Sequence, residues 1–207
     1  MEHESLPGLG VAEARPPIRN RLGAPFVELV LVLALAFGLA YAVQAWLIKP
    51  YRIPSGSMLP TLHVGDRVLA LRFPYDLHAP RRGDVVVFHP PGHGQQVVPG
   101  AHGEASVNFI KRVIGLPGEV VLIRDGTVSI CRRLHGGCHA LHESYLASSG
   151  RHIPDYGPYR VPRGDYFVLG DNRADSDDSR VWGPLPRANI IGRAFSIYWP
   201  LPRVGGI

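Results

Sequence analysis

A short polar turn carries the serines that are best placed for chemistry, in the order Ser55-Gly56-Ser57-Met58-Leu59-Pro60-Thr61-Leu62. A serine hydroxyl is a weak nucleophile at neutral pH unless a neighbouring group accepts its proton. The turn therefore predicts a nucleophile that needs a base from elsewhere in the chain. A Ser-His-Asp triad assembled in space from distant residues is one open source of that base.

A lysine within an apolar strand is a second candidate. The segment 108–114 has strand character, so Lys111 shares one face with Phe109 and Val113 while Arg112 points to the other face. Only Lys111 can lose its proton, because arginine stays charged whereas burial can lower the pKa of a lysine by several units. Lys111 is thus a candidate general base. The alternative is a lysine whose stem lies on the sheet while its ammonium group reaches water.

A dense polar block, Gly170 to Arg180, follows an apolar strand. The spacing of Asp171, Asp175 and Asp177 resembles a calcium loop, but the block lacks the glycine and the closing glutamate of such loops. Asp–Arg pairs within the block explain its composition better. Such pairs would hold the loop in shape and leave Ser176 and Ser179 free to orient a neighbouring group.

An apolar run from Phe26 to Ile48 precedes these groups, and from Leu29 onward it holds 20 residues without a charge. At about 1.5 Å per helical residue this length crosses the roughly 30 Å hydrocarbon core of a bilayer. The run predicts a transmembrane helix over 26–48, preceded by a flexible tail over 1–25. A cleavable signal ending at Ala42 is the main alternative, although the run continues past that site.

Composition predicts a single, mainly β domain over 49–207. The chain has 24 Gly and 20 Pro among 207 residues, which argues against a helical bundle. Strands are predicted at 67–71, 84–88, 108–114, 119–124, 127–131, 165–169 and 190–199. Long exposed loops are predicted at 89–107 and 144–162. A net charge of +5 without a dense basic stripe favours a phospholipid surface over nucleic acid as the anionic partner.

Two cysteines, Cys131 and Cys138, flank a Gly-Gly turn. At this spacing they could close a small disulfide loop, which requires an oxidising compartment. His135, His139 and His142 leave a zinc site open as the alternative, but these ligands match no established zinc-finger spacing. The sequence therefore predicts no metal, and whether the two cysteines are bridged stays open at this point.

Taken together, four blocks resemble type I signal peptidase. They are Ser55 to Leu62, Arg82 to Phe88, Lys111 to Gly118 and Gly170 to Arg180, in this order after one hydrophobic span. The resemblance implies an antiparallel β-sheet catalytic domain of the signal-peptidase type behind one transmembrane helix. It also implies a Ser/Lys protease without a cofactor that removes signal peptides from exported preproteins after a small-x-small site such as Ala-x-Ala.

The resemblance implies a role for each matched residue. Ser57 would be the nucleophile, Lys111 the general base, and the Ser55 hydroxyl would form an oxyanion hole with the backbone N–H of Ser57. The residues that orient the lysine or support the site would be Ser176, Asp171, Asp178 and Arg180. The pockets for small substrate side chains would be lined by Tyr51, Ile53, Met58, Leu62, Val87 and Ile110.

The same resemblance implies a place at the cytoplasmic membrane, with the N-terminus in the cytoplasm, the catalytic domain outside and the export translocon nearby. That compartment would permit a Cys131–Cys138 disulfide. The chain departs from the family pattern at Ala174, which replaces an acidic residue, and in its long 89–107 loop. Two alternatives stay open: a specialised pilin- or conjugation-type processing peptidase, and a non-catalytic membrane-anchored domain that binds peptides.

Overall fold

The computed structural model describes residues 23–72, 75, 78–92, 108–134, 136–146 and 153–207. The predicted tail up to residue 22, most of the predicted 89–107 loop and residues 147–152 therefore lie outside the described residues. The chain divides into two compact units, Met1–Ala42 and Val43–Ile207, and each has its own architecture.

Helix α1, Gly23–Leu47, begins in the first unit. Leucine and alanine are strong helix formers, and Pro25 stands in the first turn, where a proline breaks no helical hydrogen bond. Its large apolar side chains between Phe26 and Tyr41 are 47% to 78% exposed. Within the described residues, no helix meets both the length and the apolarity needed to span a membrane. The apolar run is helical as predicted, and its membrane role stays a prediction.

The second unit is a β-structure with a few short helical turns. Its strands are β1 Ile48–Arg52, β2 Arg67–Leu71, β3 Val85–Phe88, β4 Phe109–Gly115, β5 Val120–Arg124, β6 Thr127–Arg133, β7 Gly136–Ala140, β8 Tyr156–Arg160, β9 Asp165–Leu169, β10 Leu185–Pro186, β11 Ile190–Trp199 and β12 Gly205–Gly206. The helical turns are α3 Ser179–Trp182, η3 Arg187–Asn189 and η4 Leu201–Arg203.

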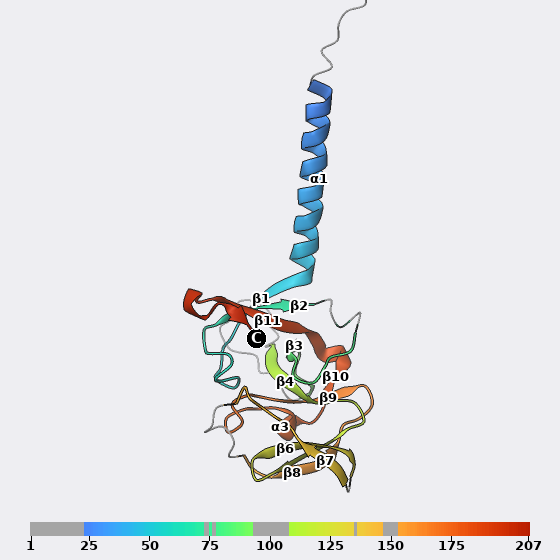
Figure 1. Cartoon of the computed structure of the whole chain (residues 1–207), viewed down its shortest axis with the longest axis vertical. Coiled ribbons are helices and arrows are strands. Elements are labelled where there is room, and N and C mark those ends of the chain that lie inside the picture. The colour runs from blue at the N-terminus through green and yellow to red at the C-terminus, as the bar shows by residue number, and fades with distance from the viewer. Residues whose placement is uncertain (1–22, 73–74, 76–77, 93–107, 135, 147–152) are drawn as a thin grey trace, which may run out of the picture. The chain divides into compact units, whose positions relative to one another are not determined.

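Among the described residues, these strands form two sheets (Figure 1). The eight-stranded sheet has the order β1-β2-β11-β3-β4-β9-β10, with β12 paired to β11, and the four-stranded sheet has the order β7-β6-β5-β8. Every ladder between the described strands is antiparallel. The predicted mainly antiparallel β fold is confirmed.

The sequence patterns missed strands that lie at sheet edges. β1 contains Pro50, and β8 contains Gly157 and Pro158. Proline cannot donate a hydrogen bond to a ladder but is tolerated where one side of the strand has no partner. The prediction of a loop over 144–162 is therefore wrong for Tyr156–Arg160, because turn-forming residues concealed an edge strand.

Strand β4 brings the two distant motif blocks together. It pairs with β3 on one side, where Lys111 lies opposite Val86, and with β9 on the other, where Arg112 lies opposite Leu169. All residues of β4 after Phe109 are buried. Because β9 leads directly into Gly170, the sheet places the polar block beside the strand that carries the lysine.

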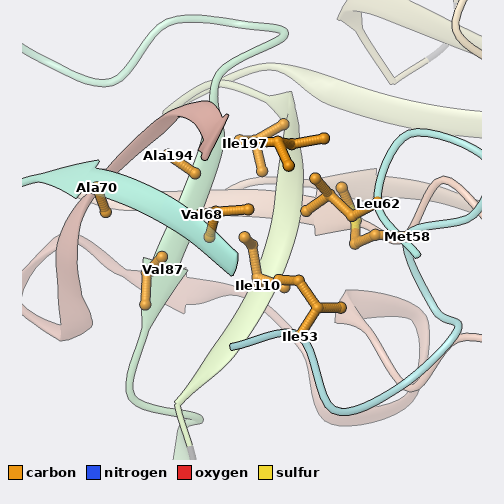
Figure 2. Packing of buried hydrophobic residues seen from close by; sticks show 10 residues of the cluster. Ile53, Met58, Leu62, Val68, Ala70, Val87, Ile110, Ala194 and Ile197 are labelled. Atoms are coloured by element: carbon orange, nitrogen blue, oxygen red, sulfur yellow. The ribbon is translucent and has the colours of Figure 1, made fainter. Parts of the chain in front are cut away.

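A hydrophobic cluster lies beneath the serine turn. Its members include Met58 and Leu62 from the turn, Val68 from β2 and Ile110 from β4, and each of these is at most 8% exposed. Figure 2 shows these side chains directed toward one another from the serine turn and from strands of the large sheet. The turn is thus held to the sheet by apolar side chains on either side of its polar groups.

Candidate active site

The serine turn is closed at its base by backbone hydrogen bonds. The N–H of Ile53 donates to the carbonyl of Asp66, and the N–H of Gly65 donates to the carbonyl of Ile53, both at 2.9 Å. A further bond of 2.9 Å runs from the Leu62 N–H to the Met58 carbonyl. These bonds fix the backbone on both sides of Ser57, so its side chain is presented in one place.

Ser57 and Lys111 are in direct contact. Lys111 Nζ lies 2.5 Å from Ser57 Oγ, and the two residues are only 4% and 9% exposed. The ammonium form donates to the hydroxyl; once the amine is neutral, the hydroxyl can donate its proton to Nζ. The Ser55 hydroxyl lies 3.4 Å from Ser57 Oγ. The arrangement supplies a nucleophile, a proton acceptor and an additional donor.

Burial lowers the pKa of Lys111 from 10.5 to about 8, because the charged amine has lost most of its hydration. The carboxylates of Asp178, Asp177 and Asp171 oppose this shift, and the Arg180 guanidinium adds to it. A lysine with this pKa is partly neutral near neutral pH. Little free energy is therefore needed to form the neutral amine, which is the form that accepts the serine proton.

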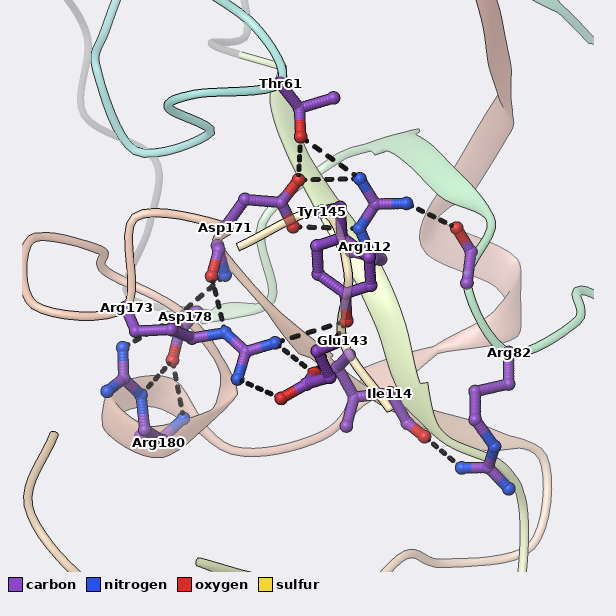
Figure 3. Close-up of polar contacts among 12 residues, drawn as sticks. Thr61, Arg82, Arg112, Ile114, Glu143, Tyr145, Asp171, Arg173, Asp178 and Arg180 are labelled. Carbon is purple, nitrogen blue, oxygen red and sulfur yellow. Dashed lines mark hydrogen bonds and ion pairs between the residues drawn. The ribbon is translucent and has the colours of Figure 1, made fainter. Parts of the chain in front are cut away.

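Asp171 and Arg112 form a buried ion pair beside the lysine strand (Figure 3). Arg112 donates from Nε to Oδ1 of Asp171 at 2.8 Å and from Nη2 to Oδ2 at 2.6 Å. The Thr61 hydroxyl donates to the same carboxylate at 2.5 Å. This carboxylate therefore joins the serine turn, strand β4 and the polar block through one side chain.

A second ion pair shapes the end of the polar block. Asp178 accepts two bonds from the Arg180 guanidinium, at 2.8 and 2.9 Å, and a bond of 3.1 Å from the N–H of Gly170. Asp178 is fully buried and also caps the N-terminus of α3. The predicted Asp–Arg pairing within the block holds for Asp178 and Arg180, whereas Asp171 pairs with Arg112 of β4.

Gly170 lies where the polar block touches the serine turn. A Cβ atom at this position would overlap the carbonyl oxygen of Ser57 and the side chain of Ser176. The Ser57 carbonyl also accepts a 3.0 Å hydrogen bond from the N–H of Asn172. The absence of a side chain at Gly170 thus lets the block and the turn pack backbone to backbone.

A family model described as "Signal peptidase, peptidase S26" matches residues 26–199 of the chain. The chain belongs to the signal peptidase family, peptidase S26. The predicted resemblance and the predicted enzyme class, a serine endopeptidase, are confirmed.

Relatives of this family cover most of the chain. Signal peptidase I of Leptolyngbya laminosa is 44% identical over 88% of this chain and 84% of its own length. Signal peptidase I of Pseudomonas fluorescens is 35% identical over 78% of this chain and 69% of its own length. A crystal structure of a signal peptidase I from Enterococcus faecalis V583 aligns with a TM-score of 0.42 at 35% identity, over 55% of this chain and 95% of that one.

The residues that the family resemblance assigns to substrate pockets lie together. Five belong to the cluster beneath the serine turn and the sixth packs against it: Ile53, Met58, Leu62, Val87 and Ile110, with Tyr51 (Figure 2). The five are closed from solvent, whereas Tyr51 is half-buried. Their roles in binding stay predictions.

The Ser176 hydroxyl makes no hydrogen bond among the described residues, although its oxygen is buried. It lies beside Gly170, where it would meet any side chain added to that glycine. Its predicted role in orienting Lys111 therefore stays a prediction.

Cys131 and Cys138 face each other across β6 and β7, and their Sγ atoms are bonded. Both sulfur atoms are then occupied and cannot ligate zinc.

The sequence did not reveal several residues that support the site. Arg173 is fully buried and pairs with Glu143, and Tyr145 stacks on Arg112. Thr61 was visible within the serine block but carried no assigned role. The segment that contains Glu143 and Tyr145 has neither a helical nor a strand period, so no pattern in it indicated contact with β4 or with the polar block.

Proposed function

We propose that this protein is a serine endopeptidase that removes signal peptides from exported preproteins, with Ser57 as nucleophile and Lys111 as general base. The observation that carries the proposal is the buried 2.5 Å contact between Lys111 Nζ and Ser57 Oγ. A Ser–Lys pair is a known variant of the serine–base arrangement. The name shared by the relatives, signal peptidase I, agrees with this substrate class.

In the first half of the reaction, neutral Lys111 accepts the Ser57 proton while Oγ bonds to the carbonyl carbon of the scissile peptide. The resulting oxyanion accepts hydrogen bonds from the Ser57 N–H and the Ser55 hydroxyl. The ammonium group of Lys111 then gives the proton to the leaving nitrogen as the C–N bond breaks. In the second half, Lys111 takes a proton from water as the water oxygen attacks the acyl carbon. Lys111 then returns that proton to Ser57 Oγ as the acyl C–O bond breaks, which releases the acid product and restores the free serine and the neutral lysine.

The polar groups around this pair have supporting roles in the proposal. Asp171 and Asp178 hold the polar block through Arg112 and Arg180, respectively. The hydroxyl of Ser176 is buried and has no partner among the described residues, so it is available to orient the lysine. The hydrophobic cluster would accept small side chains at the first and third residues before the cut, which matches an Ala-x-Ala site.

Membrane attachment forms part of the same proposal. Residues 26–48 would span the bilayer behind a cytoplasmic tail over 1–25, and residues 49–207 would form the extracytoplasmic catalytic domain close to the translocon. The run from Leu29 to Ile48 has 20 residues without a charge. That length suits a bilayer core of about 30 Å. Ser57 follows only nine residues later.

One face of the large sheet supports contact with phospholipid. On β1, β2 and β11 a row of residues runs from Arg52 to Arg67 to Trp199, and all three side chains are exposed. Like charges directly opposite each other repel, and an anionic headgroup between the arginines would relieve that repulsion. Val68, one residue further along β2, faces the buried cluster instead. Lipid and substrate would thus use opposite faces of these strands.

The decisive experiment is cleavage of a preprotein with an Ala-x-Ala site by the full-length protein in detergent. We expect a cut after the final alanine, abolished in Ser57→Ala and in Lys111→Ala. Lys49→Ala is the matched control, because Lys49 is an exposed lysine of β1. Full activity in either active-site variant contradicts the Ser–Lys pair, and an intact preprotein with the unchanged protein contradicts the peptidase.

A further inference from the structure

Two residues outside the four motif blocks link the two parts of the candidate active site. Glu143 and Tyr145 lie between β7 and β8. The ring centroid of Tyr145 lies 3.9 Å from the guanidinium carbon of Arg112, and its hydroxyl donates to Glu143 Oε1 at 2.6 Å. Glu143 in turn accepts hydrogen bonds from both terminal nitrogens of Arg173, as Figure 3 shows.

The two arginines hold different parts of the site. Arg112 directly follows Lys111 on β4 and binds Asp171. Arg173 belongs to the polar block, and its Nε donates to the Gly170 carbonyl at 3.0 Å. Gly170 is the position where the block packs on the Ser57 carbonyl. The 143–145 segment therefore contacts β4 through Arg112, and it contacts the Gly170 backbone, which packs on Ser57, through Arg173.

This network is buried and electrically balanced. The side chains of Arg173 and Asp171 are 0% exposed, and those of Arg112 and Glu143 are 8% and 9% exposed. Two cations thus face two carboxylates in a region with little water. Loss of one charge leaves its partner buried without compensation, which disturbs both geometry and local potential.

We propose that Glu143 and Tyr145 are positioning residues of the peptidase site, which hold strand β4 and the polar block in register through Arg112 and Arg173. The inference rests on the proposed function. Neither residue is hydrogen-bonded to the side chain of Ser57 or Lys111 in the described part of the chain; both act through Arg112 and Arg173. The ring of Tyr145 prevents the Arg112 guanidinium from leaving Asp171, and Glu143 fixes the direction in which Arg173 reaches Gly170.

The charges that already face Lys111 decide how this role can be measured. Asp171, Asp177 and Asp178 favour its protonated form, and Arg180 disfavours it. Altering Glu143 or Arg173 leaves these four groups in place, along with the neighbouring Arg112. A change in the pH dependence of activity then reports the uncompensated buried charge or the displaced block.

The first test compares Glu143→Gln with Arg173→Gln in the full-length protein in detergent. Both variants break the same ion pair, so both should lose about tenfold or more in kcat, with a smaller change in KM. They leave opposite charges behind. The acidic limb of the kcat/KM profile should therefore move down by about half a pH unit in Glu143→Gln and up in Arg173→Gln. Combining the two changes should return the limb toward its original position.

The second test uses the ring of Tyr145. Tyr145→Phe keeps the stacking on Arg112 and should retain more activity than Tyr145→Leu, for which we expect about a tenfold loss in kcat. The control is Tyr159→Leu, which removes a partly buried tyrosine of β8 that packs against Tyr156 and Phe167. Equal kcat losses in Tyr145→Leu and Tyr159→Leu overturn the proposal. It is also overturned if the acidic limb of the kcat/KM profile moves in the same direction in Glu143→Gln and Arg173→Gln.

A readout that does not depend on proteolysis separates this proposal from the proposed function. Formaldehyde and a hydride donor methylate unprotonated lysines, and mass spectrometry compares the rate at Lys111 with that at exposed Lys49 across a pH series. The midpoint for Lys111 should move in opposite directions in Glu143→Gln and Arg173→Gln. Opposite shifts support the positioning role even if the protein cleaves no preprotein, and unchanged midpoints overturn it even if it does.

Discussion

Lys111 and Arg112 are neighbours on β4, yet their side chains contact different motif blocks. Lys111 Nζ lies 2.5 Å from Ser57 Oγ, whereas Arg112 binds Asp171 at 2.8 and 2.6 Å. Alternation along a strand directs consecutive side chains to opposite faces. One strand can thus hold a desolvated base beside the nucleophile and, one residue later, tie the polar block to the sheet.

Gly170→Ala should abolish most of the activity. The added methyl group would overlap the Ser57 carbonyl and the Ser176 side chain, so the serine turn and the polar block must shift apart. A displacement of about 1 Å can cost on the order of 100-fold in rate. Measurement of kcat and of the melting temperature checks this, with Gly118→Ala as a control at a glycine that has open space around its Cβ direction. Because Gly118 has a positive φ, that control should lose stability but keep its kcat.

The rate should depend on pH through Lys111. Its pKa is lowered to about 8 by burial, and only the neutral amine can accept the serine proton. We therefore expect kcat/KM to fall about tenfold per pH unit below pH 8 and to level off above it. A profile from pH 6 to 10 measures this limb for the free enzyme. A flat profile across that range would contradict Lys111 as the base.

Lys111→Met should be inactive but more stable at neutral pH. The folded protein binds the Lys111 proton more weakly than the unfolded chain, because burial lowers the pKa from 10.5 to about 8. The unfolded state therefore binds more protons between these two pH values, so the stability of the unchanged protein rises across that window. Below pH 8 the full penalty remains. The methionine removes the cost of burying the protonated amine but also the hydrogen bond to Ser57. The net effect should be a rise of about 1–2 kcal/mol in the free energy of unfolding at pH 7.

Denaturant titrations of the unchanged protein and of Lys111→Met measure this difference. The advantage of the methionine variant should shrink as the pH rises from 8 toward 10.5. Lys49→Met serves as the control, because its side chain is exposed and carries no burial penalty. A Lys111→Met variant that is less stable than the unchanged protein at pH 7 is incompatible with the lowered pKa.

Arg203→Met should destabilise the serine turn, because Arg203 contacts both the turn and Asp66 behind it. Arg203 Nε lies 3.0 and 3.1 Å from the two carboxylate oxygens of Asp66, and its Nη2 donates to the Thr61 carbonyl at 3.2 Å. Asp66 is 1% exposed, so losing its cation should cost about 1–3 kcal/mol of stability. The double variant Arg203→Met/Asp66→Asn should lose less free energy of unfolding than the two single variants lose together.

Denaturant titration gives these free energies, and kcat reports whether the turn has moved. The matched control is Arg124→Met, which breaks a 3.6 Å pair with Asp155 in which both side chains are about half exposed. A surface pair of this kind contributes at most about 1 kcal/mol. Equal losses in Arg203→Met and Arg124→Met would show that the buried carboxylate does not depend on Arg203.

Arg52→Gln and Arg67→Gln should weaken docking of the catalytic domain on anionic membranes. Each arginine near an anionic bilayer contributes about 1 kcal/mol, so each change should lower the docking constant about fivefold. Quenching of Trp199 by brominated phosphatidylglycerol measures docking in vesicles that contain the full-length protein, with Trp46→Phe and Trp182→Phe as the background. Arg132 and Arg133, exposed on the small sheet, provide the control substitutions. If none of the four substitutions changes the docking constant, the face with Arg52, Arg67 and Trp199 is not the one that contacts the membrane.

Local patterns in the sequence determined much of this protein. The apolar run predicted helix α1, because a long series of helix formers without interior proline has one favourable backbone state. Alternation within 108–114 predicted a strand with Lys111 and Arg112 on opposite faces, and β4 has that form. The sequence also predicted Asp–Arg pairs within the polar block, and the structure forms one such pair, between Asp178 and Arg180.

Contacts between distant residues were decided only by the tertiary structure. Lys111 is 54 residues from Ser57, and Thr61 is 110 residues from Asp171, so the register of β4 with β3 and β9 sets their approach. Glu143 and Tyr145 had no periodic signal at all. Periodicity along a chain reports the backbone state and the face of a side chain, whereas the partner across that face depends on how the strands pair and pack.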